Sequence, residues 1–191
     1  MTPNTEEVFV YGGSFDPPHT SHVMALCAAR ALTGVRELLV VPSFKHPFGK
    51  KLAPYESRLQ LCEIAFSWIP GVRISRIESE LAGDLRTLDV LQALARQRPG
   101  IRMRLLVGSD ILNEAHKWHR WDLVSELAPP FVLGRAGHPY PGAPEAFLPQ
   151  IASRELRAAL AEGRDLPPGA LPAGVIEAIR ALGLYAGLER P

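Results

Sequence analysis

Cysteine is scarce in this chain, which contains only Cys27 and Cys62, far apart in the sequence. No CxxC pair suggests a zinc or redox site, so we expect both to be buried, reduced thiols. No run approaches the roughly 18 apolar residues that a membrane span needs. Glu6 and Glu7 stand where a signal peptide would be basic and then apolar. The sequence therefore predicts a cytoplasmic protein.

Charge of either sign is not in excess, because 21 Lys and Arg residues balance 20 Asp and Glu residues and leave a formal net charge of +1. This balance gives no global attraction to nucleic acid or to an anionic membrane, so any anion recognition must be local. With 47% hydrophobic residues over 191 positions, we expect residues 1–191 to form one globular domain. The sequence does not determine the oligomeric state, and a homo-oligomer is one possible state.

Apolar runs and helical patterns alternate along the sequence. Strands are predicted at 8–11, 37–41, 72–75, 103–107 and 131–133. Helices are predicted at 20–32, 54–68, 85–97 and 110–127, the last with a break near Trp118. This alternation predicts a doubly wound α/β domain with a mainly parallel sheet and ligands at the carboxyl ends of the strands. After a surface loop at 134–149, helices at 153–162 and 173–182 predict a small helical C-terminal portion, about residues 153–191.

The stretch GGSFDPPHTSH, residues 12–22, directly follows the first predicted strand. Gly12 and Gly13 would let a ligand approach the backbone and would tolerate a positive φ at little cost. His19 and His22 are three residues apart at the start of the next helix, which places both imidazoles on one face. The free amides and positive partial charge of a helix N-terminus favour phosphate there.

The common phosphate-binding loops are missing from the sequence. It contains no GxxxxGK[ST] motif, and no GxGxxG follows the first strand. A zinc site at the two histidines would need further Cys or His ligands at suitable spacing, which are not present. Transfer at phosphorus can depend on positioning and charge stabilisation alone, and a phosphate monoester nucleophile is already ionised near neutral pH. We therefore expect His19 and His22 to stabilise charge at an attacked phosphorus.

The same stretch resembles the GxFDPxHxGH signature of the HxGH nucleotidyltransferases, and it is most similar to the nicotinate and nicotinamide mononucleotide adenylyltransferases. The resemblance implies a Rossmann-like fold in which both histidines contact the phosphates of ATP. It also implies an ATP site that includes Gly12, Gly13, Ser14 and Phe15. Ser21 stands where the family has glycine between the histidines. Its hydroxyl could join the phosphate donors.

A second glycine follows a predicted strand in LLVGSD, residues 105–110. From the pattern alone, Asp110 could cap the next helix or accept hydrogen bonds from ribose hydroxyls. The family has a GxD at this place that holds the nucleotide, which implies an ATP-binding role for Gly108 and Asp110.

The stretch IASRELR, residues 151–157, is similar to the family's ISSTxIR, in which a serine and the arginine contact ATP phosphates. The match is partial, because Ala152 and Arg154 replace the first serine and the threonine. Ser153 and Arg157 carry over, and we expect both to point at the same anion from the start of a helix. Arg154 could add a phosphate contact.

Acceptor recognition is implied by three further stretches. HKWHRW resembles the family's KWxxW, which makes Trp118 the candidate to stack on a pyridine ring and leaves Trp121 to the core, although two tryptophans at this spacing are often both core. The loop after the second strand resembles the family's substrate loop, with Lys45 and Lys50 as candidates, and is otherwise a solvated basic loop. Thr87 matches a family threonine and could equally cap a helix.

The resemblance covers nearly the whole chain and implies adenylyl transfer from ATP to a pyridine mononucleotide in NAD biosynthesis. Nicotinate mononucleotide is the first expected acceptor and nicotinamide mononucleotide the second, with Mg²⁺ bound through the ATP phosphates and no metal site of the protein. Two alternatives stay open: another HxGH transferase such as phosphopantetheine adenylyltransferase, and a nucleotide-binding regulatory module without turnover.

Overall fold

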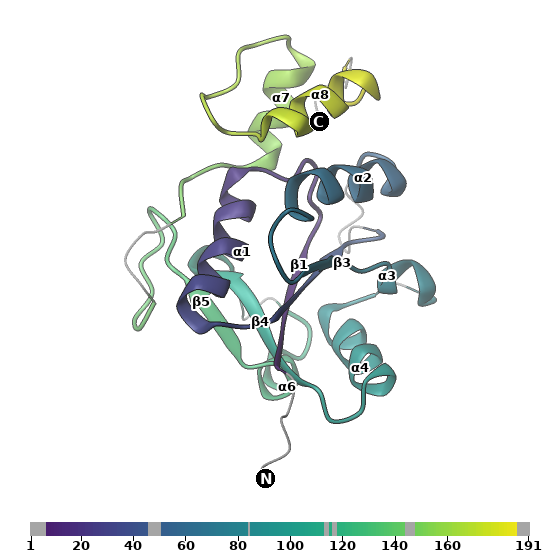
Figure 1. Ribbon diagram of the computed structural model, residues 1–191, viewed down its shortest axis with the longest axis vertical. Helices are drawn as coiled ribbons and strands as arrows, with labels where there is room; N and C mark the ends of the chain where they lie inside the picture. The colour runs from purple at the N-terminus through teal and green to yellow at the C-terminus, as the bar shows by residue number, and fades with distance from the viewer. Residues whose placement is uncertain are drawn as a thin grey trace.

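A five-stranded parallel sheet forms the centre of the computed structural model, which describes residues 7–45, 51–83, 85–112, 115, 118–143 and 148–186. Its strands are β1 Glu7–Gly13, β2 Glu37–Pro42, β3 Val72–Ile74, β4 Arg102–Gly108 and β5 Pro130–Leu133. They lie in the order β3-β2-β1-β4-β5, and all neighbouring pairs are parallel (Figure 1). The predicted doubly wound α/β architecture is confirmed.

The helices agree with the sequence pattern except for one short helix, α3. They are α1 Thr20–Thr33, α2 Tyr55–Phe66, α3 Ile77–Glu80, α4 Thr87–Gln97, α5 Ser109–Leu112, α6 Trp121–Leu127, α7 Ser153–Ala161 and α8 Ala173–Ala181. The predicted break near Trp118 in the helix at 110–127 is confirmed, because α5 and α6 are separate helices and Arg120, directly before α6, has a left-handed φ of 52°. The short α3 was not predicted, since a single turn carries too little periodicity.

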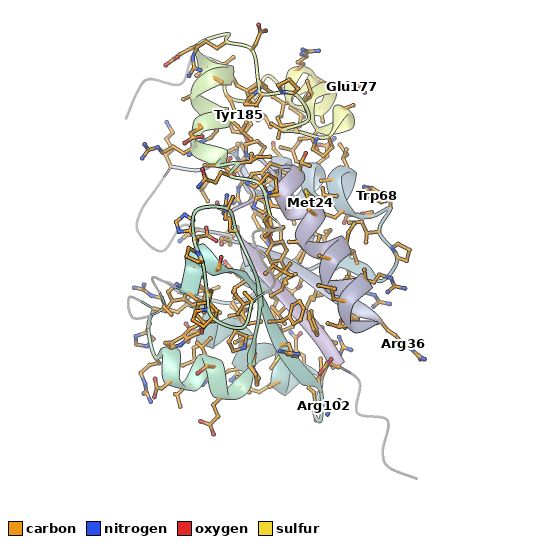
Figure 2. All side chains as sticks on the ribbon, turned by 90° about the vertical axis from the view of Figure 1, so that its left-hand side faces the viewer. Met24, Arg36, Trp68, Arg102, Glu177 and Tyr185 are labelled. Carbon is orange, nitrogen blue, oxygen red and sulfur yellow. The ribbon has the colours of Figure 1, made fainter. Side chains whose placement is uncertain are left out.

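Helices cover both faces of the sheet, as Figures 1 and 2 show. On one face, Phe9 of β1 belongs to a hydrophobic core with residues of α1, α2, α7 and α8. On the other face, Val8 and Val10 belong to a second core with residues of α3, α4 and α6. Neighbouring residues of one strand point to opposite faces, so β1 is buried on both sides and reads as a continuous apolar run.

The chain changes direction across the sheet between β1 and β4. Their pairing runs from Glu7–Arg102 to Val10–Leu105, whereas β1 continues to Gly13 and β4 to Gly108. The carboxyl-terminal residues of the two strands are therefore not paired with one another. A doubly wound sheet binds its ligands at such a point.

The C-terminal unit, α7 and α8, lies at one end of the molecule (Figure 1). Helix α8 packs against α2, and the backbone N–H of Thr20, at the start of α1, donates to the carbonyl of Ala170 at 3.0 Å. This unit therefore contacts the histidine stretch directly. Among the described residues, none of the helices has the length and apolar character needed to cross a membrane.

Candidate active site

The loop between β1 and α1 is shaped by Phe15, which has a left-handed φ of 44° and a buried ring. The ring centroid lies 5.0 Å from that of His22 and 5.5 Å from that of Tyr11. A Cβ on Gly13 would approach this ring to 3.1 Å, whereas a Cβ on Gly12 would meet no atom within 4 Å. Gly13 thus makes room for Phe15 and Gly12 borders open space. Neither glycine has a positive φ, and the left-handed residue of this loop is Phe15.

The two histidines are stacked at the start of α1. Their ring centroids are 3.6 Å apart at an interplanar angle of 19°. The backbone N–H of His19 donates to Nδ1 of His22 at 3.1 Å. Because Nδ1 of His22 is an acceptor, a neutral His22 carries its proton on Nε2, which is then a donor. The predicted shared face of the two imidazoles is confirmed.

Both histidines are uncharged near neutral pH. Burial, with the nearby positive charge of Arg135, lowers the pKa of His19 to about 3. Burial, His19 and Arg135 together hold the pKa of His22 well below its usual value of 6.5. Neutral imidazoles avoid the cost of a buried charge and still donate hydrogen bonds.

Acidification is expected to destabilise the protein through His19. Its folded pKa lies below that of an unfolded histidine, so only the unfolded state takes up this proton between about pH 6.5 and 3. Lowering the pH from about 7 to about 5 should therefore reduce the free energy of unfolding by about 2 kcal/mol through this residue. Glu78, whose pKa burial raises to about 7, acts in the opposite direction.

Chemical denaturation of wild type and of His19→Asn at both pH values isolates the histidine, because Glu78 is common to the two proteins. The loss of stability on acidification should be about 2 kcal/mol smaller in the variant. Equal losses in both proteins would show that His19 titrates in the folded state as it does in the unfolded chain.

Arg135 is a site residue that the sequence analysis missed. It directly follows Gly134 after β5, and its Nη1 donates to Oδ2 of Asp110 at 2.7 Å. Its Nη2 donates to the carbonyl of Ile151, and its backbone N–H donates to Oγ of Ser109 at 2.8 Å. Although 134–149 was predicted as a surface loop, its first residues belong to the site. The signal was available, because a glycine and a polar residue after a strand is the pattern that identified Gly108 and Asp110.

Asp110 lies in the first turn of α5, at the carboxyl end of β4. Its Oδ1 is buried and has no hydrogen-bond partner within the part of the chain that the structure describes. A Cβ on Gly108 would collide with this Oδ1 at 2.4 Å, so the glycine makes room for the carboxylate. Oδ1 is therefore a free acceptor at the carboxyl end of β4.

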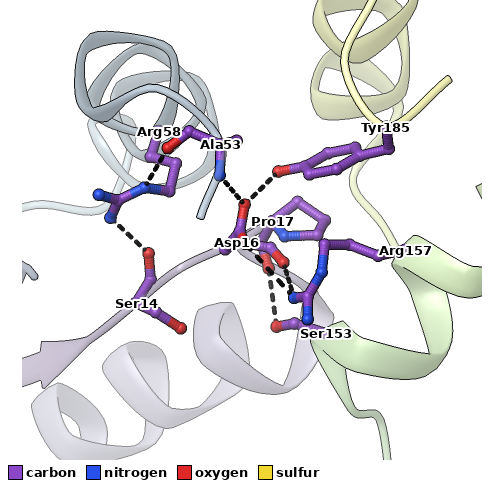
Figure 3. A network of polar contacts seen from close by, with 8 residues as sticks. All are labelled: Ser14, Asp16, Pro17, Ala53, Arg58, Ser153, Arg157 and Tyr185. Atoms are coloured by element: carbon purple, nitrogen blue, oxygen red, sulfur yellow. Dashed lines mark hydrogen bonds and ion pairs between the residues drawn. The ribbon is translucent and has the colours of Figure 1, made fainter. Parts of the chain in front are cut away.

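Ser153 and Arg157 contact the histidine loop from α7 (Figure 3). Oγ of Ser153 donates to the carbonyl of Pro17 at 3.1 Å, and Nη1 of Arg157 donates to the carbonyl of Asp16. Nη1 of Arg157 also lies 3.5 Å from Oδ2 of Asp16, whose side chain is 1% exposed. In this structure the anion that Arg157 faces is thus the Asp16 carboxylate. Arg154, in contrast, is exposed to solvent.

Ser21 does not join the phosphate donors. Its side chain is buried, and Oγ donates to the carbonyl of Pro149 at 2.8 Å. The hydroxyl therefore ties α1 to the segment before α7, which corrects the expectation of a phosphate contact. The family's glycine cannot make this bond, since it has no side chain.

The candidate acceptor residues lie on several elements. Lys45 is exposed after β2, Thr87 begins α4 and is half-buried, and Lys50 lies outside the described residues. Trp118 is half-buried before α6 and meets Trp121 edge to face, with ring centroids 5.5 Å apart. Both tryptophans pack against the second core. Trp118 therefore packs against the core in part, and the remainder of its side chain is exposed. The stacking role stays a prediction.

Both cysteines are free thiols, and Cys62 is buried as predicted. The predicted burial of Cys27 is wrong, because that residue is half-buried. Arg58 of α2 is buried, and its Nη1 donates to the carbonyl of Ser14 at 2.8 Å. Its side chain therefore supports the loop that follows β1.

Comparison with known proteins identifies the family. The cytidylyltransferase-like family profile matches residues 10–159. A probable nicotinate-nucleotide adenylyltransferase of Anaeromyxobacter dehalogenans is 48% identical to this chain, over 95% of this chain and 97% of its own length. This chain belongs to the nicotinate-nucleotide adenylyltransferases.

Other members of the family agree with this assignment. A probable nicotinate-nucleotide adenylyltransferase of Myxococcus xanthus is 38% identical over 96% of each chain. The solved Plasmodium falciparum nicotinic acid mononucleotide adenylyltransferase, complexed with NaAD, has a TM-score of 0.80 at 20% identity and covers 94% of this chain and 97% of its own. This likeness confirms the Rossmann-like fold that the histidine motif implied.

Replacing Ser21 by glycine in this adenylyltransferase should lower kcat/KM less than about tenfold, because the hydroxyl bonds to Pro149 and not toward the histidine pair. The variant should lose about 1–2 kcal/mol of stability, from the lost hydrogen bond and the glycine in a helix. Steady-state kinetics and thermal unfolding test both expectations. A thousandfold loss of kcat/KM would instead give Ser21 a role in the chemistry.

Proposed function

We propose that this adenylyltransferase joins the adenylyl group of ATP to nicotinate mononucleotide and releases pyrophosphate. The observation that supports this most strongly is the stacked, neutral pair of His19 and His22 at the carboxyl end of β1. The curated relatives at 48% and 38% identity carry the nicotinate name, which favours the acid over the amide as acceptor. A cytoplasmic location and a homo-oligomer remain predictions.

The reaction needs no general base from the protein. A phosphate oxygen of the mononucleotide, ionised near neutral pH, attacks the α-phosphorus of ATP. One P–O bond forms while the bond to pyrophosphate breaks, and pyrophosphate leaves with the electron pair. His22 can donate from Nε2 to an oxygen whose charge grows in the transition state, because its Nδ1 is occupied by the His19 N–H.

The ATP side of the site is supported by the geometry around β1 and β4. The open space beside Gly12 gives a phosphate access to the backbone. We assign the backbone of Gly13, Ser14 and Phe15, which follows, to the same ATP site. The free Oδ1 of Asp110 is an acceptor for a ribose hydroxyl. Ser153 begins α7 and Arg157 lies one turn later, beside the same loop, where both can donate to bound phosphates as well as to the loop carbonyls.

A magnesium ion bound with ATP would neutralise part of the triphosphate charge. Across the described ranges, no three His, Cys, Asp or Glu side chains come together in an arrangement that could hold a metal ion.

The acceptor side is assigned to the exposed part of Trp118, with Thr87 and the loop that begins at Lys45. A flat pyridine ring offers a face to stack on tryptophan. The positive side chains of Lys45 and Lys50 suit the acceptor phosphate or carboxylate.

Pyrophosphate release tests the function. ATP and Mg²⁺ are supplied with nicotinate mononucleotide, nicotinamide mononucleotide or phosphopantetheine in turn, and His19→Ala serves as the inactive control. Release should be fastest with nicotinate mononucleotide. Preferred release with phosphopantetheine would overturn the acceptor, and no release with any of them would indicate a nucleotide-binding module without turnover.

A further inference from the structure

The carboxylate of Asp16 is the centre of a buried polar network that joins three distant parts of the chain (Figure 3). Oδ1 accepts from the hydroxyl of Tyr185 at 2.9 Å and from the backbone N–H of Ala53 at 3.3 Å. Oδ2 faces Nη1 of Arg157 at 3.5 Å. A fully buried carboxylate needs such partners, because burial without them is costly.

Tyr185 reaches this carboxylate from beyond the end of α8. Its residue is 5% exposed and has a left-handed φ of 67°, which is unfavourable for a side chain of this size. Such a conformation persists only where the surroundings hold it in place. Burial and the neighbouring Asp16 carboxylate raise the pKa of the Tyr185 phenol, so the hydroxyl stays a donor.

The network holds the backbone that leads to the histidines. The carbonyls of Ser14, Asp16 and Pro17 accept from Arg58, Arg157 and Ser153 respectively. These carbonyls lie within the few residues before His19. The Asp16 side chain is the one acidic group of this loop, and Tyr185 is its only side-chain hydroxyl donor among the described residues.

We propose that Tyr185 is a positioning residue for adenylyl transfer, which acts through Asp16 to hold the loop of residues 14–19 and thereby His19 and His22 in their reactive arrangement. The C-terminal unit is then part of the active-site scaffold. This inference rests on the proposed function and adds to it the role of a residue far from the histidines in sequence.

Tyr185→Phe removes the hydroxyl and keeps the ring. Because small displacements of a catalytic group cost much rate, kcat should fall about twentyfold, while the KM for ATP should change less than about threefold. The matched control is Ile179→Val, which removes one buried methylene from α8 in the same core and leaves Asp16 untouched. It should lower the unfolding temperature while kcat stays within about twofold.

A double-mutant cycle tests the route through Asp16. Asp16→Asn keeps the shape of the side chain but removes its negative charge, which strengthens the hydrogen bond from Tyr185. Tyr185→Phe should therefore cost at most about threefold in kcat in the Asp16→Asn background. Equal costs in both backgrounds, or the same kcat for Tyr185→Phe, Ile179→Val and wild type, would overturn the proposal.

Titration of the histidine C2 protons by NMR, assigned with His19→Asn and His22→Asn, separates this proposal from the proposed function. In wild type and Ile179→Val neither resonance should titrate between about pH 5.5 and 8, because desolvation lowers the pKa of both imidazoles below this range. In Tyr185→Phe at least one should titrate, as the loosened loop admits water. This result would support the positioning role even if no acceptor gave pyrophosphate, and unchanged resonances would contradict it even in an active enzyme.

Discussion

Replacing His19 by alanine is expected to lower kcat about a thousandfold, while the KM for ATP changes less than about fivefold. In the free protein His19 is neutral and buried, and its imidazole stacks on His22 at 3.6 Å between centroids. A hydrogen bond from His19 to the attacked phosphate therefore strengthens most when negative charge grows on the phosphate oxygens. The loss should appear in the chemical step and little in ground-state binding.

Steady-state kinetics with varied ATP, together with direct measurement of ATP binding, separate the two effects. The exposed His119 is the matched control, and His119→Ala should keep kcat within about twofold. If His19→Ala kept the wild-type kcat, His19 would have no part in the mechanism. A rise in the KM alone would make it a binding residue.

Replacing Arg135 by glutamine should lower kcat/KM about a hundredfold and should destabilise the protein by about 2 kcal/mol. Arg135 pairs with Asp110 at 2.7 Å, and both side chains are about one-fifth exposed. Without the guanidinium, the Asp110 carboxylate loses its ion-pair partner and the site loses a positive charge that would attract the triphosphate.

Arg102→Gln is the matched control, since Arg102 also pairs with a carboxylate, Glu7, but at 4.0 Å on the surface. Figure 2 shows Arg102 at the end of the molecule opposite Tyr185. In kinetics and chemical denaturation, Arg102→Gln should resemble wild type, because exposed ion pairs contribute little. Arg135→Gln should show nearly the full predicted losses of kcat/KM and of stability. Similar small changes in both would show that Arg135 has no part in the site.

Much of the fold and the centre of the site were predictable because their signals are local. The apolar runs coincide with β1, β2, β4 and β5, and the histidine stretch falls between β1 and α1 as expected. A separation of three residues is enough to bring the side chains of His19 and His22 onto one face at the start of α1. The break between α5 and α6 was also indicated, although its cause, the left-handed Arg120, was not visible in the pattern.

The remaining site residues depend on contacts over long sequence distances. Arg135 is 25 residues from Asp110, Ser21 is 128 residues from Pro149, and Tyr185 is 169 residues from Asp16. Composition and periodicity report which residues are buried but not which of them meet. The sequence therefore suggested phosphate for Ser21, where the structure shows a carbonyl.

By itself, the sequence determined the α/β architecture, the position of the histidine pair at a strand end, and the family, because periodicity and short motifs encode them within a few neighbouring residues. Only the tertiary structure decided the protonation of that pair, the anion that faces Arg157, and the attachment of the C-terminal unit to the catalytic loop. Burial and the pairing of charges are properties of packed neighbours, and parallel strands joined by helices bring those neighbours together from across the whole chain.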